Sequence, residues 1–407
     1  MSARLQAPRG TSDVQPGDAR RRLRLVGIAD ELLGRAGYEP FETPVFEDTE
    51  LFTRGVGEST DIVQKEMFTF EDKAGRSLTL RPEATAAICR AYVEHGMHKL
   101  PQPVRLWYLS SFFRYERAQA GRYRQFWQIG VEALGSDDPA VDAEAIVLLH
   151  TLLQELRVRG TRLRLSSLGT PETRAAYLDE LRAHLLAHEK DLSGEVRERL
   201  GQNPLRAFDA DHPGTQAVMR EAPLLIDRLT TEDAEHFDEV RALLDEAGIE
   251  YDLDPTLVRG LDYYTRTVFE FVSDRLGAQA ALGGGGRYDG LVEELGGPPT
   301  PGVGFAAGIE RILMAAEEPE TDAGIDVFVA GSGRPAFALT SRLRDTGLRA
   351  QMEQAGRSLK GQLKQADRLR ARWTVILDEG IEVRDMQSGE QRTAADVEDV
   401  LRMVRDS

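Results

Sequence analysis

Two long segments with the residue pattern of β-strands lie close together in the chain and constrain its fold most. Residues 104–115 (VRLWYLSSFFRY) and 124–134 (RQFWQIGVEAL) are rich in aromatic and β-branched side chains, which favour strands. The connection between them, ERAQAGRY, is charged and contains Gly121, which suits a turn. The pattern therefore predicts an antiparallel hairpin with a charged loop.

Polar residues are placed regularly on this hairpin. Gln128 and Glu132 lie four positions apart in the second segment, so their side chains should project from the same face of the strand. Charged residues gather at the loop end of both segments; they are Arg114, Glu116, Arg122 and Arg124. Either a solvated edge or a polar binding site explains this arrangement.

The segment LTLRPEATA (78–86) also combines an apolar strand pattern with charges. Arg81 ends the strand, Pro82 turns the chain, and Glu83 and Thr85 open a helix. A purely structural role for Glu83 is to stabilise the N-terminus of that helix. The alternative is that Glu83 and Thr85 face a binding site.

The stretch RGLDYYTRTVFE (259–270) places a cation, an anion and two phenols at the entry to a strand. A hydrophobic core accepts the tyrosines but not an unpaired arginine, whereas a polar pocket accepts all of them. The structural alternative is an ion pair of Arg259 with Asp262. A fourth segment, GFAAGIERIL (304–313), keeps a strand bare with Gly304 and Gly308 and sets Arg311 near a helix start.

Composition limits the classes of function. The chain has 407 residues and a net charge of −17, which argues against a protein that coats nucleic acid generally. A single cysteine, Cys89, excludes an internal disulfide framework and a multi-cysteine metal site. We find neither a long apolar run nor a secretory signal, so we expect no membrane span and a cytoplasmic location.

The rest of the chain alternates between helical and extended patterns. We expect a helix at 16–36 with Leu23, Val26, Leu32 and Leu33 on its apolar face, a helix at 139–157, and helices from about 170 to 250. Strands are expected at 266–273 and 279–283, followed by GGGGRYDGLVEELGG. A linker at 317–324 precedes a βα alternation, which indicates a small α/β domain.

Together these segments resemble the class II aminoacyl-tRNA synthetases. FRYERAQAGRYRQF is similar to the motif 2 hairpin, GVGFAAGIERIL is similar to motif 3, and TPVFEDTELF, with Pro44, occupies the place of motif 1. RGLDYYTRTVFE and GGGGRYDGLVEELGG resemble the two signature segments of the histidyl-tRNA synthetases. Ala118, Arg370 and Asp378 depart from the family pattern, because proline is common at the first position and glycine at the other two.

The resemblance implies an α+β fold whose catalytic domain, at 1–165 and 255–318, is built on an antiparallel sheet. It also implies a helical insertion at 166–254 and a C-terminal α/β domain of the anticodon-binding type at 324–407. The implied reaction joins L-histidine to tRNA-His through a histidyl-adenylate, using ATP with Mg²⁺. The family further implies a homodimer.

The same resemblance implies roles for individual residues. Arg114 and Arg259 would be catalytic and hold the α-phosphate, with Glu116 and Arg311 also binding ATP. Arg122 and Arg124 would contact tRNA, and no metal site would be fixed by the protein alone. Histidine would be bound by Glu83, Thr85, Gln128, Glu132, Tyr263 and Tyr264.

Two competing functions have their own sequence signs. A regulatory paralogue from histidine biosynthesis would typically lack the C-terminal domain and the arginine of RGLDYY, yet this chain has an α/β tail and Arg259. A binding module without catalytic activity would not need to keep Arg114, Arg259 and Arg311 together. Histidine-dependent pyrophosphate exchange separates these possibilities.

Overall fold

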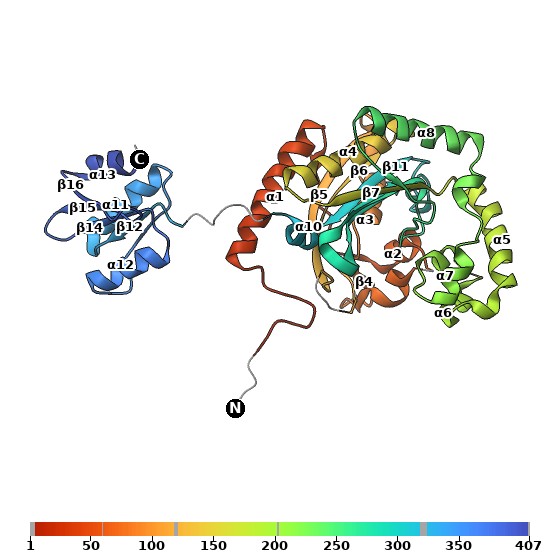
Figure 1. The fold of residues 1–407 in the computed structure, drawn as a ribbon, viewed down its shortest axis with the longest axis horizontal. Helices are drawn as coiled ribbons and strands as arrows, with labels where there is room; N and C mark the ends of the chain where they lie inside the picture. The colour runs from red at the N-terminus through yellow and green to blue at the C-terminus, as the bar shows by residue number, and fades with distance from the viewer. Residues whose placement is uncertain (1–4, 59, 118–120, 202, 318–323, 406–407) are drawn as a thin grey trace. The chain divides into compact units, whose positions relative to one another are not determined.

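The computed structural model describes residues 5–58, 60–117, 121–201, 203–317 and 324–405. The chain divides into two compact units, Met1–Glu317 and Glu318–Ser407 (Figure 1). Among the helices of the described residues, none combines the length and the apolar character that a membrane crossing requires.

A large mixed sheet forms the centre of the first unit. Its strands lie in the order β1-β5-β6-β11-β10-β9-β7-β8. The edge pairs β1–β5 and β7–β8 are parallel, and the pairs between them are antiparallel. The strand bounds are Glu39–Pro40 (β1), Val104–Phe113 (β5), Gln125–Leu134 (β6), Thr161–Ser167 (β7), Asp252–Leu253 (β8), Thr265–Ser273 (β9), Ala281–Arg287 (β10) and Gly302–Gly308 (β11).

Helices pack on one face of this sheet and form the main hydrophobic core with it. The core takes alternate residues of the strands, such as Ile129 and Val131 of β6, because successive strand side chains point to opposite faces. The opposite face of β6 is left for Gln128 and Glu132. The helices that contribute are α1 (Pro16–Arg35), α4 (Pro139–Glu155), α8 (Thr231–Glu246) and α10 (Ile309–Ala315).

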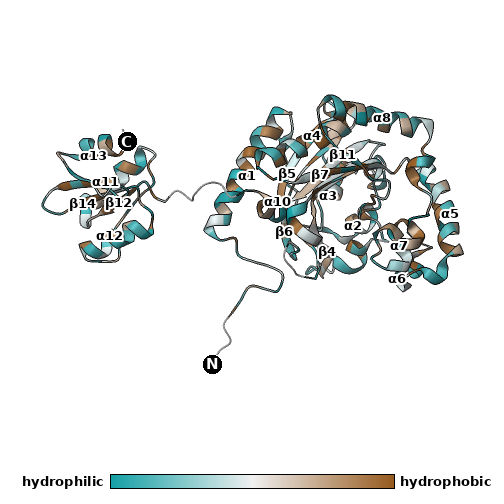
Figure 2. Cartoon of the chain, in the orientation of Figure 1, coloured by the Kyte–Doolittle hydropathy of each residue, from teal (hydrophilic) through white to brown (hydrophobic). Residues whose placement is uncertain are grey.

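Helix α1 has the expected length, but one of its predicted core residues is on the wrong face. Leu32 and Leu33 are buried together with Leu25 and Ala29, whereas Leu23 is 70% exposed. Leu23 precedes Leu25 by two positions, about 200° around the helix, so the two side chains cannot share a face. Figure 2 shows hydrophobic and hydrophilic residues on different parts of the surface of α1.

Short helices and a small antiparallel sheet, β2-β4-β3, complete the first unit on the N-terminal side. Helix α3 packs against β5 through Ile88, Tyr92 and Leu106, and it begins at the site segment that contains Thr85. The bounds are Phe46–Asp48 (β2), Phe68–Glu71 (β3), Ser77–Leu80 (β4), Thr49–Val56 (α2), Thr85–Glu94 (α3) and Leu291–Glu294 (α9).

The helical region between β7 and β8 has its own hydrophobic cluster. Tyr177, Leu181 and Leu185 of α5 pack in that cluster with Tyr264, which directly precedes β9, and with Val268 inside β9. The region therefore lies directly against residues 259–264 (RGLDYY), here called the arginine-tyrosine motif. The helices are α5 (Pro171–Ala187), α6 (Gly194–Arg199) and α7 (Pro213–Met219).

The second unit is a mixed sheet, β13-β12-β14-β15-β16, with helices on both faces. The βα alternation was predicted, but the antiparallel strands β15 and β16 were not. Arg370 has a positive φ of 48°, a conformation that favours glycine, which is the residue that the family resemblance leads us to expect there. The bounds are Val327–Ala330 (β12), Gly333–Asp345 (α11), Ala350–Met352 (β13), Leu359–Arg368 (α12), Trp373–Leu377 (β14), Ile381–Asp385 (β15), Gln391–Ala394 (β16) and Val397–Arg405 (α13).

The predicted α+β class with a large sheet and an added C-terminal α/β unit is confirmed. The expected hairpin is β5–β6, which pairs in antiparallel register from Val104 opposite Leu134 to Phe113 opposite Gln125. Strand β7, which the sequence analysis left unassigned, pairs with β9. The expected boundaries of the insertion at residues 166 and 254 stay a prediction.

A buried ion pair fastens the sheet to helix α4. The side chains of Arg287 in β10 and Asp142 in α4 are both 0% exposed, and Arg287 Nε lies 3.2 and 3.1 Å from the two carboxylate oxygens. Arg287 also donates to the carbonyl of Ser136 and to Asp289. Removing Asp142 would leave the buried guanidinium of Arg287 without its main anionic partner.

We therefore expect Asp142→Ala to lower the free energy of unfolding by about 3–5 kcal/mol, the usual cost of breaking a buried pair by removing one partner. Denaturant titration measures this change. Asp274→Ala, which removes an exposed partner of Arg162, is the control and should cost about 0–1 kcal/mol. Equal losses in the two variants would contradict the role given to the Arg287–Asp142 pair.

Candidate active site

A polar cavity lies over the face of the large sheet that the main core leaves free. Its walls come from the β5–β6 hairpin, the start of α3, the segment before β9, and the glycine-rich strands β10 and β11. The cavity brings together most of the residues expected from the sequence. Its lining includes Glu83, Thr85, Arg114, Glu116, Arg122, Gln128, Arg259, Tyr263, Tyr264 and Arg311.

Small residues keep the floor of this cavity open. Gly130 in β6, Ala306 in β11 and Gly284 in β10 are paired across the sheet in one row. A Cβ atom on Gly284 would lie 3.0 Å from Arg259 Nη1, and one on Gly304 would lie 2.1 Å from Glu132 Oε2. Side chains at these positions would displace the charged groups of the site.

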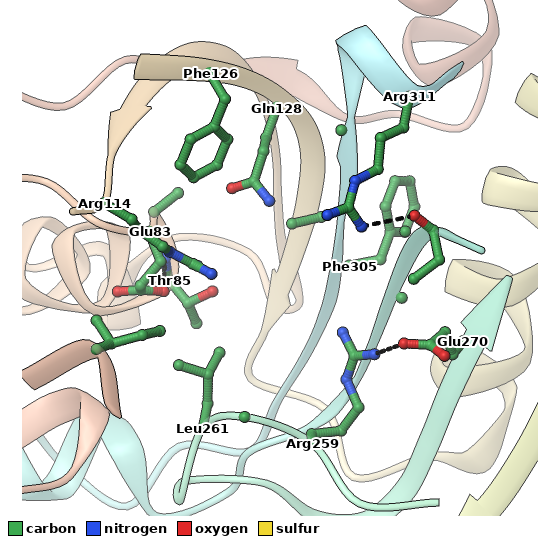
Figure 3. Close-up of a pocket in the computed structure, with 18 of the residues that line it drawn as sticks. Glu83, Thr85, Arg114, Phe126, Gln128, Arg259, Leu261, Glu270, Phe305 and Arg311 are labelled. Carbon is green, nitrogen blue, oxygen red and sulfur yellow. Dashed lines mark hydrogen bonds and ion pairs between the residues drawn. The ribbon is translucent and has the colours of Figure 1, made fainter. Parts of the chain in front are cut away.

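Three arginines point into the cavity from different sides (Figure 3). Arg114 is held by a 2.9 Å hydrogen bond from its Nε to the carbonyl of Pro82. Arg311 donates to the carbonyls of Gly121 and Ala281, both at 2.9 Å. Burial, and to a smaller extent the neighbouring Arg122, lower the pKa of Arg311.

The third arginine, Arg259, is paired with Glu270 and not with Asp262, the partner considered in the sequence analysis. Arg259 Nη1 lies 2.7 Å from Glu270 Oε1 (Figure 3). Asp262 accepts a hydrogen bond from Asn203 Nδ2 at 3.1 Å. Burial opposes the charge of Arg259, but Tyr264 and Glu270 outweigh this effect and raise its pKa. The guanidinium is therefore charged and oriented.

Glu83 lines the acidic end of the cavity, and the predicted site residue Glu132 lies outside the lining, hydrogen-bonded to the lining residues Thr85 and Tyr288. Glu83 accepts hydrogen bonds from the backbone N–H groups of Thr85 (2.7 Å) and Ala86 (2.9 Å), so the helix-capping role considered above is present. Glu132 is 1% exposed and accepts from Thr85 Oγ1 at 2.8 Å and from the hydroxyl of Tyr288. Burial raises the pKa of Glu132 to about 8, although both hydrogen bonds oppose the shift.

Two buried polar atoms at the cavity have no hydrogen-bond partner among the described residues: Gln128 Oε1 and Arg259 Nε. Both residues line the cavity. Buried polar groups are normally paired, so an unpaired acceptor and an unpaired donor at one cavity indicate a polar ligand. Gln128 suits a cationic or N–H donor group, and Arg259 suits an anion.

The tyrosines form a cluster beside this acidic end. Tyr263 and Tyr264 have ring centroids 4.8 Å apart, and Tyr263 meets Tyr288 edge to face at 5.7 Å. The hydroxyl of Tyr263 lies 3.5 Å from Glu83 Oε2. A small aromatic group that can form hydrogen bonds fits such a wall.

The two arginines assigned to tRNA lie in different places. Arg122 lines the cavity, with its Nε 3.4 Å from Glu116 Oε2. Arg124 stacks on the ring of Tyr115, 3.7 Å from its centroid, and Tyr115 is 52% exposed. Residues 118–120 at the tip of this loop, including Ala118, lie outside the described residues.

Two residues that line the cavity, Glu270 and Tyr288, were not predicted from the sequence. Glu270 orients Arg259, and Tyr288 donates to Glu132. Glu270 lies in the segment RGLDYYTRTVFE and Tyr288 in GGGGRYDGLVEELGG. The sequence feature that could have identified them is a polar side chain within a strand pattern, for Glu270, or directly after one, for Tyr288. Neither could be paired with its partner from sequence, because 156 positions separate Tyr288 from Glu132.

Within the described residues, no three His, Cys, Asp or Glu side chains are grouped as ligands for a metal ion. The carboxylates that line the cavity are Glu83, Glu116, Glu270 and Glu310. Four arginines, Arg114, Arg122, Arg259 and Arg311, line the same cavity and suit an anionic ligand.

Comparison with known proteins gives one consistent result. The family model described as "Histidyl-tRNA synthetase" matches residues 10–312. The chain is 50% identical over 404 residues to a histidine–tRNA ligase of Rubrobacter xylanophilus, with 95% of each chain covered. It is 48% identical over 400 residues to a histidine–tRNA ligase of Desulforamulus reducens, again with 95% of each covered.

Solved structures agree with the sequence comparisons. The crystal structure of apo S. aureus histidyl-tRNA synthetase superposes with a TM-score of 0.81, at 36% identity and with 99% of each chain covered. An ATP phosphoribosyltransferase regulatory subunit/histidyl-tRNA synthetase from Bacillus halodurans superposes with a TM-score of 0.66 at 23% identity, covering 90% of this chain and 97% of that one. The second likeness shows the fold alone.

The pKa of Glu132 predicts how stability depends on pH. The folded protein binds this proton more tightly than the unfolded chain, because the pKa rises from 4.5 to about 8. Protonation of Glu132 therefore contributes favourably to the free energy of unfolding. This contribution is fully present below pH 4.5 and is lost as the pH rises to 8. The loss is up to about 1.4 kcal/mol for each pH unit in that window.

The glutamine in Glu132→Gln cannot titrate. We therefore expect the free energy of unfolding of the variant, relative to that of the parent, to increase as the pH rises from 5 to 8. Denaturant titrations at several pH values in this window measure the difference. A difference that stays constant with pH would show that the Glu132 carboxyl is not held protonated by burial.

Proposed function

This chain belongs to the histidyl-tRNA synthetase family, and on that premise we propose that it attaches L-histidine to tRNA-His through a histidyl-adenylate. The observation that carries the proposal is the meeting of three arginines with an acidic, tyrosine-lined recess in one cavity. The first group suits the phosphates of ATP. The second suits the ammonium and imidazole of histidine.

The first step joins histidine to AMP. The histidine carboxylate attacks the α-phosphorus of ATP, the bond to the β-phosphate oxygen breaks, and pyrophosphate leaves. Negative charge gathers on the α-phosphate oxygens, and preorganised cations stabilise it. We assign this role to Arg114 and Arg259, and we assign Arg311 and Glu116 to binding of the rest of ATP.

Histidine is selected by groups that satisfy both of its ends. Glu83, Thr85 and the unpaired Oε1 of Gln128 accept hydrogen bonds from the α-ammonium group. Glu132 and Tyr264 pair with the two imidazole nitrogens, and Tyr263 lines the recess. An amino acid without those nitrogens would leave buried polar groups unpaired, a penalty that gives about 10⁴-fold discrimination.

The second step transfers the histidyl group. The 3′-terminal ribose hydroxyl of tRNA attacks the carbonyl carbon of the adenylate, and AMP leaves with the electron pair of the broken bond. Mg²⁺ would enter with ATP and would neutralise its pyrophosphate oxygens. The proposed reaction, together with a single cysteine that cannot form an internal disulfide, supports a cytoplasmic location.

The regulatory paralogue is not favoured. The relatives that cover nearly the whole chain are named as ligases, and Arg259, which that class typically loses, lines the cavity here. The Bacillus halodurans protein is described in part as a regulatory subunit, but its 23% identity to this chain supports only a shared fold.

The C-terminal unit supports the use of tRNA as substrate. Helix α12 exposes Lys360, Lys364 and Arg368 at four-residue spacing, so the three cations share one face. We assign this unit to binding of the anticodon region. The acidic net charge of −17 makes such local basic surfaces necessary for contact with RNA.

A homodimer is the assembly that we propose. Exposed apolar side chains on the small sheet support it: Phe46 is 51% and Phe70 is 42% exposed, and their rings are 6.1 Å apart. Phe46 belongs to the segment that resembles motif 1, which the family uses in its dimer. Burial of these rings by a second copy would remove them from water.

Pyrophosphate exchange tests the proposed function directly. We expect ATP–pyrophosphate exchange to require histidine and to stay at background with each of the other amino acids. Transfer of labelled histidine to tRNA-His, and not to other tRNAs, completes the test. Exchange with a different amino acid, or none with histidine, would contradict the assignment.

The stacked Arg124 predicts a separation of the two steps. Because Arg124 lies on an exposed tyrosine and outside the cavity lining, we expect Arg124→Gln to slow charging of tRNA about tenfold through a lost phosphate or stacking contact. Histidine-dependent pyrophosphate exchange should stay within twofold of the parent.

The matched control is Arg76→Gln, which changes an exposed arginine that pairs with Asp72 on the β3–β4 turn. This variant should charge tRNA normally. Equal losses of exchange and charging in Arg124→Gln would place Arg124 in the adenylation site and remove it from the tRNA surface.

A further inference from the structure

A run of charged side chains continues from Arg259 away from the cavity. Arg259 pairs with Glu270, Glu270 pairs with Arg164, and Arg164 pairs with Asp254. The run crosses from the segment before β9 to strands β9 and β7 and ends just after β8. Only its first two members line the cavity among the described residues.

The register of the sheet fixes the middle of this run. Arg164 in β7 and Glu270 in β9 are directly opposite each other in the antiparallel pair, so their side chains leave the same face. Arg164 Nη1 lies 3.2 Å from Glu270 Oε2, and Arg259 Nη1 lies 2.7 Å from the other oxygen, Oε1. One carboxylate therefore holds two guanidinium groups.

The far end of the run is anchored to the segment that leads into the arginine-tyrosine motif. Arg164 Nε donates to Asp254 Oδ2 at 2.6 Å. The other oxygen of Asp254 accepts from the N–H and hydroxyl of Thr256, at 3.0 and 2.7 Å. Asp254 N also donates to the carbonyl of Leu165 at 2.9 Å. Arg164 thus joins the start of this segment to the carboxylate that orients its arginine.

The shared carboxylate has an electrostatic consequence. The side chains of Arg164 and Glu270 are 34% and 17% exposed, so their interaction is only partly screened by water. With Arg164 present, Glu270 orients Arg259 while Arg164 neutralises part of the negative charge of Glu270. Without Arg164, this negative charge would act in full. It would attract the guanidinium of Arg259 more strongly, away from the cavity, and it would repel the phosphates of ATP.

We propose that Arg164 is a positioning residue for histidyl-adenylate formation, and that it acts through Glu270 on Arg259. The inference rests on the proposed function, since it concerns the adenylation step. Arg164 lines no part of the cavity in the described structure and contacts neither substrate site. Its effect should therefore depend on Arg259.

The same strand supplies a matched control. Arg162 precedes Arg164 by two positions in β7 and leaves the same face of the sheet. It is also paired with carboxylates, Asp274 at 3.2 Å and Asp252 at 3.8 Å, but neither belongs to the run that reaches Arg259. Loss of Arg162 removes an arginine and its ion pairs without touching Glu270.

The test is the single-turnover rate of histidyl-adenylate formation, measured by rapid quench with saturating ATP and histidine. We expect Arg164→Ala to slow this rate about 5- to 10-fold, the effect of losing one partly buried charge partner, and Arg162→Ala to stay within twofold. The apparent affinity for histidine should not change, because the histidine groups lie at the other end of the cavity.

A double-mutant cycle separates positioning from general destabilisation. In the Arg259→Ala background, adding Arg164→Ala should change the rate by less than twofold, since the group that Arg164 acts upon is gone. A full Arg164→Ala effect in that background, or a rate equal to that of Arg162→Ala in the parent, would overturn the proposal. If Arg164→Ala does not fold, Arg164→Lys takes its place in the cycle and should lose about threefold, because lysine cannot bridge both carboxylates in the planar geometry of arginine.

The outcome is separable from the proposed function. A parent protein that forms no adenylate with histidine would refute the proposed function itself. A parent that forms adenylate, with Arg164→Ala variants that behave as Arg162→Ala does, would refute only the positioning role.

Discussion

The polar cavity depends on glycines in the central sheet, because positions without side chains let charged groups lie close to the backbone of the strands. Gly304 and Gly284 stand opposite Glu132 and Glu270 in the register of the sheet. A Cβ on Gly304 would come within 2.1 Å of Glu132 Oε2, and one on Gly284 within 3.0 Å of Arg259 Nη1. The bare backbone lets the carboxylate and the guanidinium lie flat on the sheet. The cavity, its acidic recess and its cationic side follow from this open floor.

Charge at this depth has to be balanced, and the two ends of the cavity do so differently. At the acidic end, burial raises the pKa of Glu132 to about 8, so this carboxyl is mainly protonated at neutral pH. At the cationic end, Tyr264 and Glu270 outweigh the effect of burial and raise the pKa of Arg259, and Glu270 Oε1 lies 2.7 Å from its guanidinium. The first arrangement lowers stability at neutral pH, and the second holds a charged guanidinium in the cavity. Both trade local stability for a site prepared before the substrates arrive.

Much of this arrangement was predictable from the sequence, because strand alternation is a local property. Alternation placed Gln128 and Glu132 on one face of β6, and the turn residues predicted the β5–β6 hairpin. Pairing across the sheet was not predictable in the same way. Arg259 was considered a partner of nearby Asp262, but the register of β7, β9 and β10 brings Glu270 to it, with Arg164 behind. Leu23 was misplaced because counting apolar residues does not fix the rotation of a helix. The family resemblance named most of the site residues; Glu270 and Tyr288 became visible only through their contacts.

The most direct test of the account is a crystal structure of the protein with ATP and histidinol, which lacks the carboxylate and cannot react. The account predicts that the imidazole lies between Glu132 and Tyr264, and that Arg114 and Arg259 both lie within about 3 Å of α-phosphate oxygens. Arg259 should still pair with Glu270 in that complex. An α-phosphate bound without Arg259, or an imidazole outside the Glu132 recess, would contradict the account.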